Sequence, residues 1–112
     1  MNMAALTCLV PGRELENAKE DFRTAEKVEQ YRVSGNALYL PAGLKWNYLP
    51  ISAISRAEES FRVISAGHCV PVREKRPELD LLTETGETVH ISLEKQAGMQ
   101  KILEVLARAG KA

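Results

Sequence analysis

The amino-acid sequence predicts an α+β domain, mainly β, in which about seven antiparallel strands form a bent barrel that a C-terminal helix caps. Three observations lead to this prediction. Residues 31–93 alternate between apolar and polar in short runs with short connections, which favours antiparallel pairing. Residues 94–110 carry a continuous apolar stripe at helical spacing. Residues 13–30 carry a narrower stripe, which predicts an extra N-terminal helix.

The composition bounds the class of protein. The 112 residues make one ordinary domain, long enough to bury a core without disulfides or metals. Hydrophobic residues make up 45% and charged residues 27%, as in globular rather than disordered chains. Lys plus Arg and Asp plus Glu both total 15, and a net charge of zero argues against a dedicated nucleic-acid or anionic-membrane binder. We expect no nucleic-acid partner, although zero net charge is compatible with a local basic patch.

The cysteines and the apolar stretches indicate a compartment. Cys8 and Cys69 are too few for a disulfide framework and are expected to be small apolar residues. No stretch approaches the roughly 18 apolar residues of a membrane span. Residues 1–10 are apolar but lack the Lys or Arg that begins a signal peptide. We therefore expect a cytoplasmic protein.

The N-terminal part divides into two elements. Residues 1–12 end in Pro11-Gly12 and form either a short strand or a hydrophobic arm. We expect residues 3–10 to pack on the body or on a second copy of the chain, which makes a homodimer a candidate assembly. Residues 13–30 are predicted to be one amphipathic helix. Its apolar face consists of Leu15, Ala18, Phe22, Ala25 and Val28.

The central strands follow from alternation and turn chemistry. Short strands are predicted at residues 31–34 and 37–40, with turns at 35–36 and 41–43. Residues 44–49 alternate up to Pro50, and a single turn then places Ile51 and Ile54 in the core. Residues 55–65 are the longest strand candidate, followed by a turn at residues 66–68.

The C-terminal part is predicted to be a loop, a hairpin and a helix. Residues 73–77 read as a charged loop, and residues 79–83 and 88–93 as a hairpin with Gly86 at its tip. Ser92 is a candidate N-cap and Gly110 a candidate C-terminal stop for the helix. The helix presents one apolar face, made of Met99, Ile102, Leu103, Leu106 and Ala109. Leu103 and Leu106 are expected to be buried.

Three stretches together resemble a pleckstrin-homology-like (PH-like) domain of the small bacterial kind. They read LKWNYLPISAISRAEE (residues 44–59), LDLLTETGETVHISL (79–93) and MQKILEVLARAG (99–110). The resemblance covers about two-thirds of the chain, from residue 31 onward. It implies a bent barrel of two near-orthogonal sheets capped by the C-terminal helix, and a domain that binds lipids, peptides or proteins rather than an enzyme. The additional N-terminal helix departs from the minimal form of this family.

Two groups of residues are candidates for binding. Arg73, Lys75 and Arg76 form the densest basic cluster and are candidates for contact with an anion or a lipid, although a charged loop of this kind is often simply solvated. A second group comprises Tyr39, Trp46 and Tyr48, together with Phe61. These aromatic side chains could line a peptide groove and are candidates for partner contact, or they belong to the core.

The sequence offers no motif for catalysis, a metal or a cofactor. Cys8, His68, Cys69 and His90 lack the paired close spacings typical of zinc sites, and nothing marks a nucleophile elbow or a Gly-rich phosphate loop. Phosphoinositide-binding members of the resembled superfamily place Lys and Arg between their first two strands. Here only Arg32 and Lys45 lie nearby, as isolated charges.

The favoured function is a non-catalytic interaction module that binds a protein or peptide or associates with itself. The alternative is a lipid- or membrane-associated PH-like or GRAM-like domain that uses residues 73–76, and an enzyme is least favoured. Zero net charge makes a membrane-lipid partner less favoured than a protein.

Overall fold

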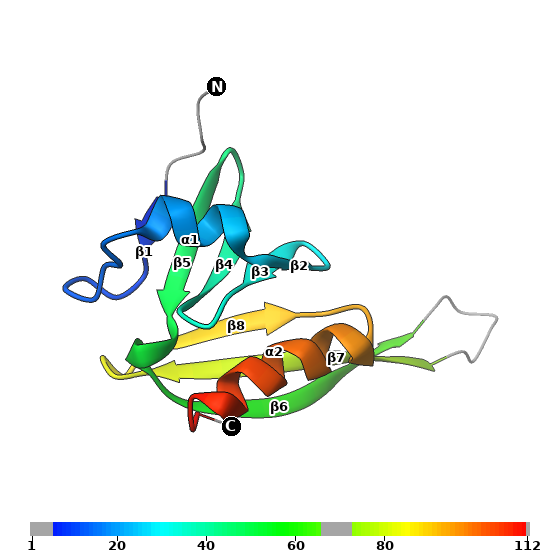
Figure 1. Ribbon diagram of the computed structural model, residues 1–112. Coiled ribbons are helices and arrows are strands. Elements are labelled where there is room, and N and C mark those ends of the chain that lie inside the picture. The colour runs from blue at the N-terminus through cyan, green and yellow to red at the C-terminus, as the bar shows by residue number, and fades with distance from the viewer. Residues whose placement is uncertain (1–5, 66–72, 112) are drawn as a thin grey trace.

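The computed structural model describes residues 6–65 and 73–111, without the side chains of residues 63–65 and 73–75. The chain is α+β, mainly β, with two sheets that cross each other and a helix against each sheet (Figure 1). Its elements, in order, are β1 Leu6–Cys8, α1 Ala18–Thr24, β2 Glu26–Val28, β3 Tyr31–Val33, β4 Ala37–Ala42, β5 Lys45–Pro50, the 3-10 turn η1 Ile51–Ala53, β6 Ile54–Ser65, β7 Arg73–Thr83, β8 Thr88–Ser92 and α2 Gln96–Arg108.

The two sheets are separate rather than a closed barrel. One has five strands in the order β1-β5-β4-β3-β2, and the other has three in the order β6-β7-β8. Hydrogen bonding between neighbouring strands joins no strand of one sheet to the other among the described residues, so the expected bent barrel is an open pair of sheets. The hydroxyl of Tyr31 links the sheets by donating to the carbonyl of Ser92 at 2.9 Å. The antiparallel expectation holds for every pair except β1, which runs parallel to β5.

The N-terminal segment packs on the body of its own chain. Residues 6–8 extend the sheet beside β5, the amide of Leu9 donates to the carbonyl of Tyr48 at 2.9 Å, and Val10 is buried in the core. The described part of the expected docking segment thus covers the edge of β5. Residues 1–5 lie outside the described residues, as does the turn expected at residues 66–68.

The N-terminal helix is shorter than expected. A single helix over residues 13–30 is wrong, because α1 spans Ala18–Thr24 and Glu26–Val28 forms a strand paired with β3. The reason is that two apolar residues of this segment pack on opposite faces of the five-stranded sheet. Phe22 packs on the outer face of the five-stranded sheet, whereas Val28 belongs to the main core on the inner face. One straight helix cannot reach both faces, so the chain turns at Ala25 and passes around the sheet edge.

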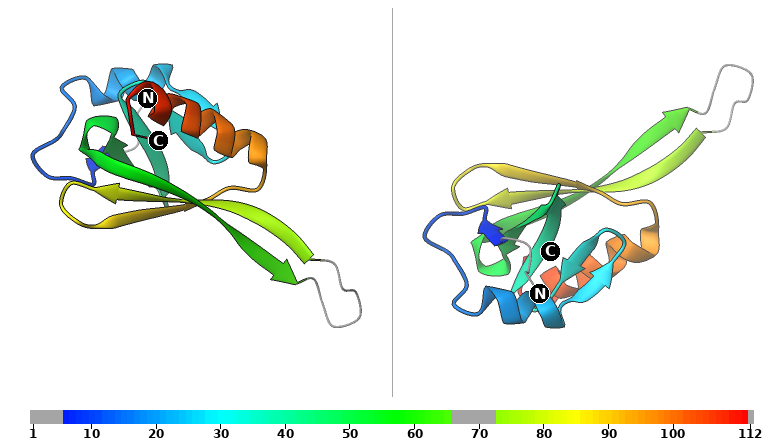
Figure 2. Two further views of the ribbon diagram at one scale, coloured as in Figure 1. Left: turned by 90° about the horizontal axis from the view of Figure 1, so that it is seen from below. Right: turned by 90° about the horizontal axis from the view of Figure 1, so that it is seen from above.

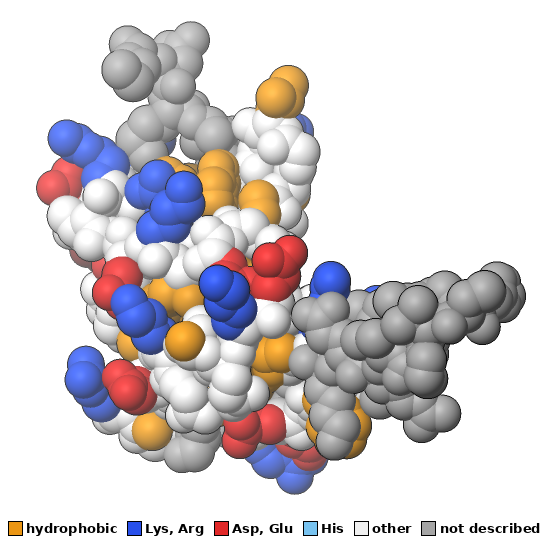
Figure 3. Space-filling view, turned by 90° about the vertical axis from the view of Figure 1, so that its right-hand side faces the viewer, with side chains coloured by type: hydrophobic (Ala, Val, Ile, Leu, Met, Phe, Trp, Pro, Cys, Tyr) orange, Lys and Arg blue, Asp and Glu red, His pale blue; other side chains and the backbone are white. Residues whose placement is uncertain are grey.

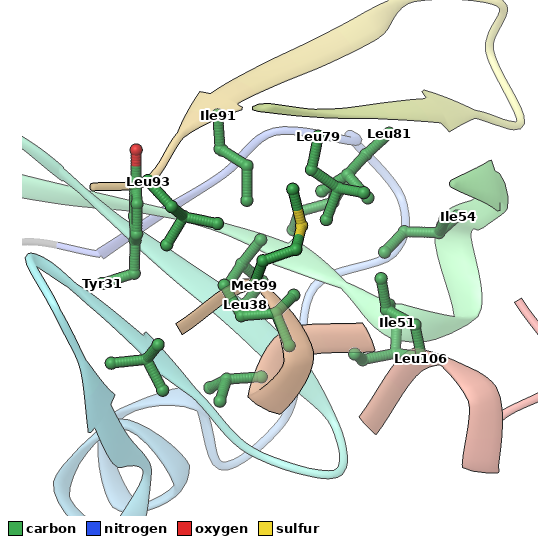
Figure 4. Close-up of a cluster of buried hydrophobic side chains, with 14 of the residues drawn as sticks. Tyr31, Leu38, Ile51, Ile54, Leu79, Leu81, Ile91, Leu93, Met99 and Leu106 are labelled. Atoms are coloured by element: carbon green, nitrogen blue, oxygen red, sulfur yellow. The ribbon is translucent and has the colours of Figure 1, made fainter. Parts of the chain in front are cut away.

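The main core fills the space between the two sheets and α2. Side chains from η1, from both sheets and from α2 converge there, with Met99 of α2 among them (Figure 4). The single turn Ile51–Ala53 buries Ile51 and Ile54 as predicted. Leu106 of the capping helix is also buried as predicted, but Leu103 is only partly buried at the rim of this core. The inner residues of the β7–β8 hairpin complete the cluster, as their alternation predicted.

The ends of α2 are set by residues from elsewhere in the chain. Ser92 is not its N-cap, because Lys95 occupies that position and makes no side-chain cap. Instead the carboxylate of Glu29 accepts the amides of Glu94 and Lys95 at 2.7 and 3.1 Å. At the other end Gly110 has a φ of 75°, and the amide of Lys111 turns back to the carbonyl of Leu106 at 2.8 Å. The predicted glycine stop is therefore confirmed.

Candidate functional site

The most prominent surface feature is a two-stranded arm. β6 and β7 pair over their whole length, but β8 pairs with β7 only from Glu78 to Leu82. The remainder, residues 61–65 and 73–77, projects as a twisted ribbon past α2 and β8 (Figures 1 and 2). We call this ribbon the hairpin arm. A two-stranded ribbon without a third strand or a helix is marginally stable in water, so the arm gains most from a partner.

The expected charged loop is part of this arm. Residues 73–77 are not a loop, because β7 begins at Arg73 and its first five residues pair with residues 61–65 of β6. Positions 73 and 75 share one face of the strand and position 76 belongs to the other, since alternate residues face opposite sides. Arg73, Lys75 and Arg76 therefore belong to one paired strand rather than to a loop, and Arg76 stands opposite Arg62 in the register.

Hydrophobic exposure on the described surface concentrates at two hairpins. Phe61, at the base of the arm, is 60% exposed, and Leu44, at the turn between β4 and β5, is 96% exposed. Figure 3 shows positive and negative side chains interspersed with small hydrophobic areas on the side from which the arm projects. Phe61 is the larger apolar group, and it lies where β6 and β7 continue as a two-stranded ribbon.

The aromatic candidates mostly belong to a second, smaller core. Tyr39 and Tyr48 are buried under α1, so their rings offer no surface to a partner. Trp46 is half-buried and packs edge-on against Phe22, with ring centroids 5.0 Å apart. The guanidinium of Arg32 covers both rings, at 4.6 Å from the centroid of Phe22 and 5.9 Å from that of Trp46. Only Trp46 of the three retains an accessible edge.

A carboxylate at the start of α1 organises this second core. Asp21 accepts hydrogen bonds from the hydroxyl of Ser34 at 2.6 Å, from the side-chain Nδ2 of Asn36 at 2.9 Å, and from the hydroxyl of Tyr39. Burial, aided by the bond to Asp21, raises the pKa of Tyr39 far above its ordinary value. The network keeps the phenol protonated and in place. Its geometry is that of a structural tie between α1 and the sheet.

A cross-strand polar cluster lies on the outer face of the three-stranded sheet. His90 of β8 contacts Asp80, its partner in register, through Nδ1, and its Nε2 lies 2.5 Å from Glu78. The hydrogen bond to Asp80 raises the pKa of His90, and the negative charges of Glu78 and Asp80 act in the same direction while burial opposes them. His90 is half exposed to solvent, and a hollow of about 140 Å³ beside the cluster is lined by Arg56, Glu58, Asp80, Leu82 and Thr88.

The hollows of the described surface are open and shallow. One of about 390 Å³ lies between Leu15, Asn36, Ile51 and Lys111, and one of about 450 Å³ lies beside the start of α1. A smaller hollow of about 200 Å³ at the start of α2 carries Lys27, Lys95 and Lys101. Its helix terminus is already occupied by the carboxylate of Glu29. None of these hollows combines buried polar groups in the way that a small-molecule site requires.

Two polar contacts were not predicted from the sequence: the ion pairs of His90 and the capping of α2 by Glu29. The ion pairs of His90 follow from the hairpin, because a hairpin with Thr85 at its centre places Asp80 opposite His90. Among the described residues, no group of three or more His, Cys, Asp or Glu side chains could hold a metal ion. The capping role of Glu29 left no local signal, because its partners lie 65 residues away or more along the chain.

Comparisons with known proteins add no relative. The chain matches no family model, no curated protein and no solved structure. Within the described residues, α2 is the longest helix, and no helix is long and apolar enough to cross a membrane.

Proposed function

We propose that this chain is a non-catalytic interaction module of the PH-like type, and that the hairpin arm is its docking element. The PH-like assignment is supported by the chain order of the elements: a four-strand meander β2–β5, a three-strand meander β6–β8 and then the helix α2. Domains of this arrangement bind through their edges and loops, and the arrangement alone specifies no ligand.

One observation carries the docking role. The arm leaves the body as a two-stranded ribbon and presents Phe61 with 60% of its surface in water. A partner that covers this side chain gains the burial of a large apolar group, about 1.5–3 kcal/mol, and stabilises the ribbon as well. The protein's open hollows offer nothing comparable, which favours a protein or peptide over a small molecule.

Site-specific photo-crosslinking tests the docking role. Phe61 is replaced by p-benzoylphenylalanine in cells of the native host, and Leu44, which is still more exposed, serves as the matched control position. We expect one defined adduct from position 61 and none from position 44, because exposure alone does not select a partner. No adduct at position 61, or the same diffuse pattern at both positions, contradicts the proposal.

A lipid-binding function is the second candidate, and the basic residues of the arm favour it. Arg62, Arg73, Lys75 and Arg76 lie on the same ribbon with Glu74 as the only acid among residues 61–65 and 73–77. A local excess of positive charge attracts anionic headgroups, and salt weakens that attraction. Sedimentation with phosphatidylserine vesicles and with phosphatidylcholine vesicles, each at low and high salt, decides. Binding only to the anionic vesicles, and only at low salt, would support lipid over protein.

A further inference from the structure

The outer edge of β6 is the longest strand edge of the described structure, and the bond from the amide of Ala57 to the carbonyl of Lys111 occupies it at one position. β6 has 12 residues and pairs on one side only, with β7, whereas β8 at the other edge of the same sheet has five residues. Natural sheets protect their edges by keeping edge strands short or by placing proline in them. β7 follows that rule at the point where β8 ends, because Pro77 stands there. β6 has no proline.

Two hydrogen bonds show which backbone groups of β6 point outward. The carbonyl of Pro77 accepts the amide of Leu93 at 2.9 Å, so the backbone groups of Pro77 point away from β6. Its partner in register is Phe61, and opposite residues of an antiparallel pair have the same orientation. The amide of Ala57 likewise points outward, because it donates to the carbonyl of Lys111 at 3.2 Å. The odd-numbered positions of β6 therefore direct their amides and carbonyls to the outer edge.

This orientation restricts how a second copy of β6 can pair with the first. Outward positions must face outward positions, so odd residues face odd residues and even residues face even ones. In an antiparallel, two-fold symmetric pair, the axis then passes through a residue. With the axis at Ser60, Glu58 faces Arg62 of the second copy, and the same ion pair repeats on the other side of the axis. Both side chains are exposed in the single chain, where Glu58 also forms an ion pair with Arg56 at 2.7 Å.

The neighbouring registers lack this complementarity. An axis at Glu59 sets that carboxylate against its own copy and sets Arg56 against Arg62, which is repulsive in both cases. An axis at Phe61 sets Ser60 against Arg62 and forms no ion pair between described side chains. Within one chain Arg62 already faces Arg76 across β6 and β7. A carboxylate from a second copy beside Arg62 offsets that like-charge pair.

We propose that two copies of this chain join through the outer edges of β6, antiparallel and with Ser60 on the two-fold axis. The two three-stranded sheets then form one continuous six-stranded sheet. The inference rests on the proposed docking role of the arm and identifies its partner as a second copy of the chain. The interface is isologous, the commonest symmetry of soluble oligomers. Backbone pairing supplies affinity, and the two Glu58–Arg62 contacts between copies select the register.

A charge-reversal cycle tests the register. Sedimentation velocity is measured on the parent chain, on Glu58→Arg, on Arg62→Glu and on the double variant. We expect a dimer for the parent. For each single variant we expect the dissociation constant of the dimer to rise by roughly tenfold or more, because two attractive pairs become two repulsive ones. The double variant restores both pairs and regains the dimer. Glu104→Arg, on the exposed face of α2, is the matched control and leaves association unchanged.

A disulfide at the axis gives an independent readout. Opposite residues of a non-hydrogen-bonded antiparallel pair have Cα atoms about 4.5 Å apart, within the range that a disulfide spans. Ser60→Cys should therefore form a covalent dimer under mild oxidation. Ser52→Cys, exposed on η1, should form no more covalent dimer than the parent with its native cysteines.

A proline on the outer edge of β6 tests the backbone pairing. Glu59→Pro removes an amide that β7 does not use and should leave a folded monomer.

The outcomes separate this inference from the proposed docking role. The β6 interface is overturned if the parent chain is still monomeric at 100-fold its concentration in the cells used for crosslinking. It is also overturned if the two single variants, the double variant and the Glu104→Arg control all dimerise equally. If position 61 then still crosslinks to another protein, the docking role stands and the partner is not a second copy. If position 61 gives no adduct as well, both proposals fail.

Discussion

Glu29 provides the sharpest test of how the two ends of the fold are tied together. It lies in the turn between β2 and β3 with a φ of 54°, and its carboxylate accepts the amides of Glu94 and Lys95 ahead of α2. A hydrogen bond to a charged group contributes about 1.5–3 kcal/mol, and an N-terminal cap typically about 1 kcal/mol. Because Glu29 is partly exposed, we expect Glu29→Ala to cost about 2 kcal/mol of unfolding free energy.

Glycine at the same position separates the cap from the backbone. The left-handed conformation costs a residue with a Cβ about 1–2 kcal/mol and costs glycine almost nothing. Glu29→Gly loses the same cap as Glu29→Ala but relieves this strain. We therefore expect the glycine variant to be about 1 kcal/mol more stable than the alanine variant. This order is the reverse of the one that an ordinary extended or helical position would give.

Gly98 completes the test, because it faces the same carboxylate. A Cβ built on Gly98 would lie 2.6 Å from Oε2 of Glu29. Gly98→Ala should therefore destabilise the parent by displacing the carboxylate, although alanine is the better helix former. In the Glu29→Gly background that clash is absent, and the same change should stabilise the protein by up to about 1 kcal/mol.

Urea unfolding followed by circular dichroism gives the free energy of unfolding of the parent, Glu29→Gly, Gly98→Ala, the double variant with both changes, and Glu29→Ala. For a domain of this length, 1 kcal/mol corresponds to about 4–8 °C in melting temperature, so thermal melts are a second readout. The reasoning is refuted if Gly98→Ala has the same effect in both backgrounds, since the two sites would then not touch. Equal stabilities of the alanine and glycine variants at position 29 would refute the left-handed conformation.

Three further predictions concern the two cores and the outer face. Leu106→Ala should cost about 2–5 kcal/mol, and Leu103→Ala clearly less because its side chain lies at the rim of the core; equal costs in chemical denaturation would contradict this placement. Tyr39→Phe should cost about 1–2 kcal/mol through the lost bond to Asp21, and in an alkaline absorbance titration the parent should retain a tyrosine that resists ionisation and that Tyr39→Phe lacks. His90 has a raised pKa in the folded state, so its stabilising contribution is complete below about pH 6.5 and is lost as the pH rises through the folded-state pKa. His90→Gln should therefore cost more at pH 5.5 than at pH 8.5, by less than about 1 kcal/mol because the side chain is half exposed, and an equal cost at both values would exclude the ion pairs.

The parts of the fold that sequence predicted are those that local pattern determines. Alternation and a glycine at φ 91° define the β7–β8 hairpin, and an unbroken apolar stripe defines α2. The turn at Ile51–Ala53 followed from a proline between two apolar segments. In each case neighbouring residues along the chain determine the element, so the periodicity of apolar residues is sufficient to predict it.

The parts that sequence missed depend on partners distant in the chain. Residues 26–28 fit a helical stripe as well as a strand, and the choice is made by pairing with β3. Sequence left open whether Tyr39 and Tyr48 line a groove or belong to the core, because a stripe as narrow as that of α1 does not reveal that a helix covers them. The same reasoning explains the candidate site: a charged segment with a proline at its end reads as a solvated loop until β6 supplies a partner of equal length.

The arm itself requires an account of why charged residues extend a sheet into solvent. Pairing satisfies the backbone groups between β6 and β7, and charges on both strands oppose the nonspecific edge association that a long apolar ribbon would promote. The same charges do not exclude every partner. In the proposed register Glu58 attracts Arg62, whereas an axis at Glu59 sets Arg56 against Arg62, which is how charge patterns combine avoidance with specificity. A segment that served only as a spacer would need neither a 12-residue strand nor Phe61 at its base. The long strand, the proline on the opposite edge and the alternating charges are therefore most economically explained together, by an edge that is protected against most partners and open to one.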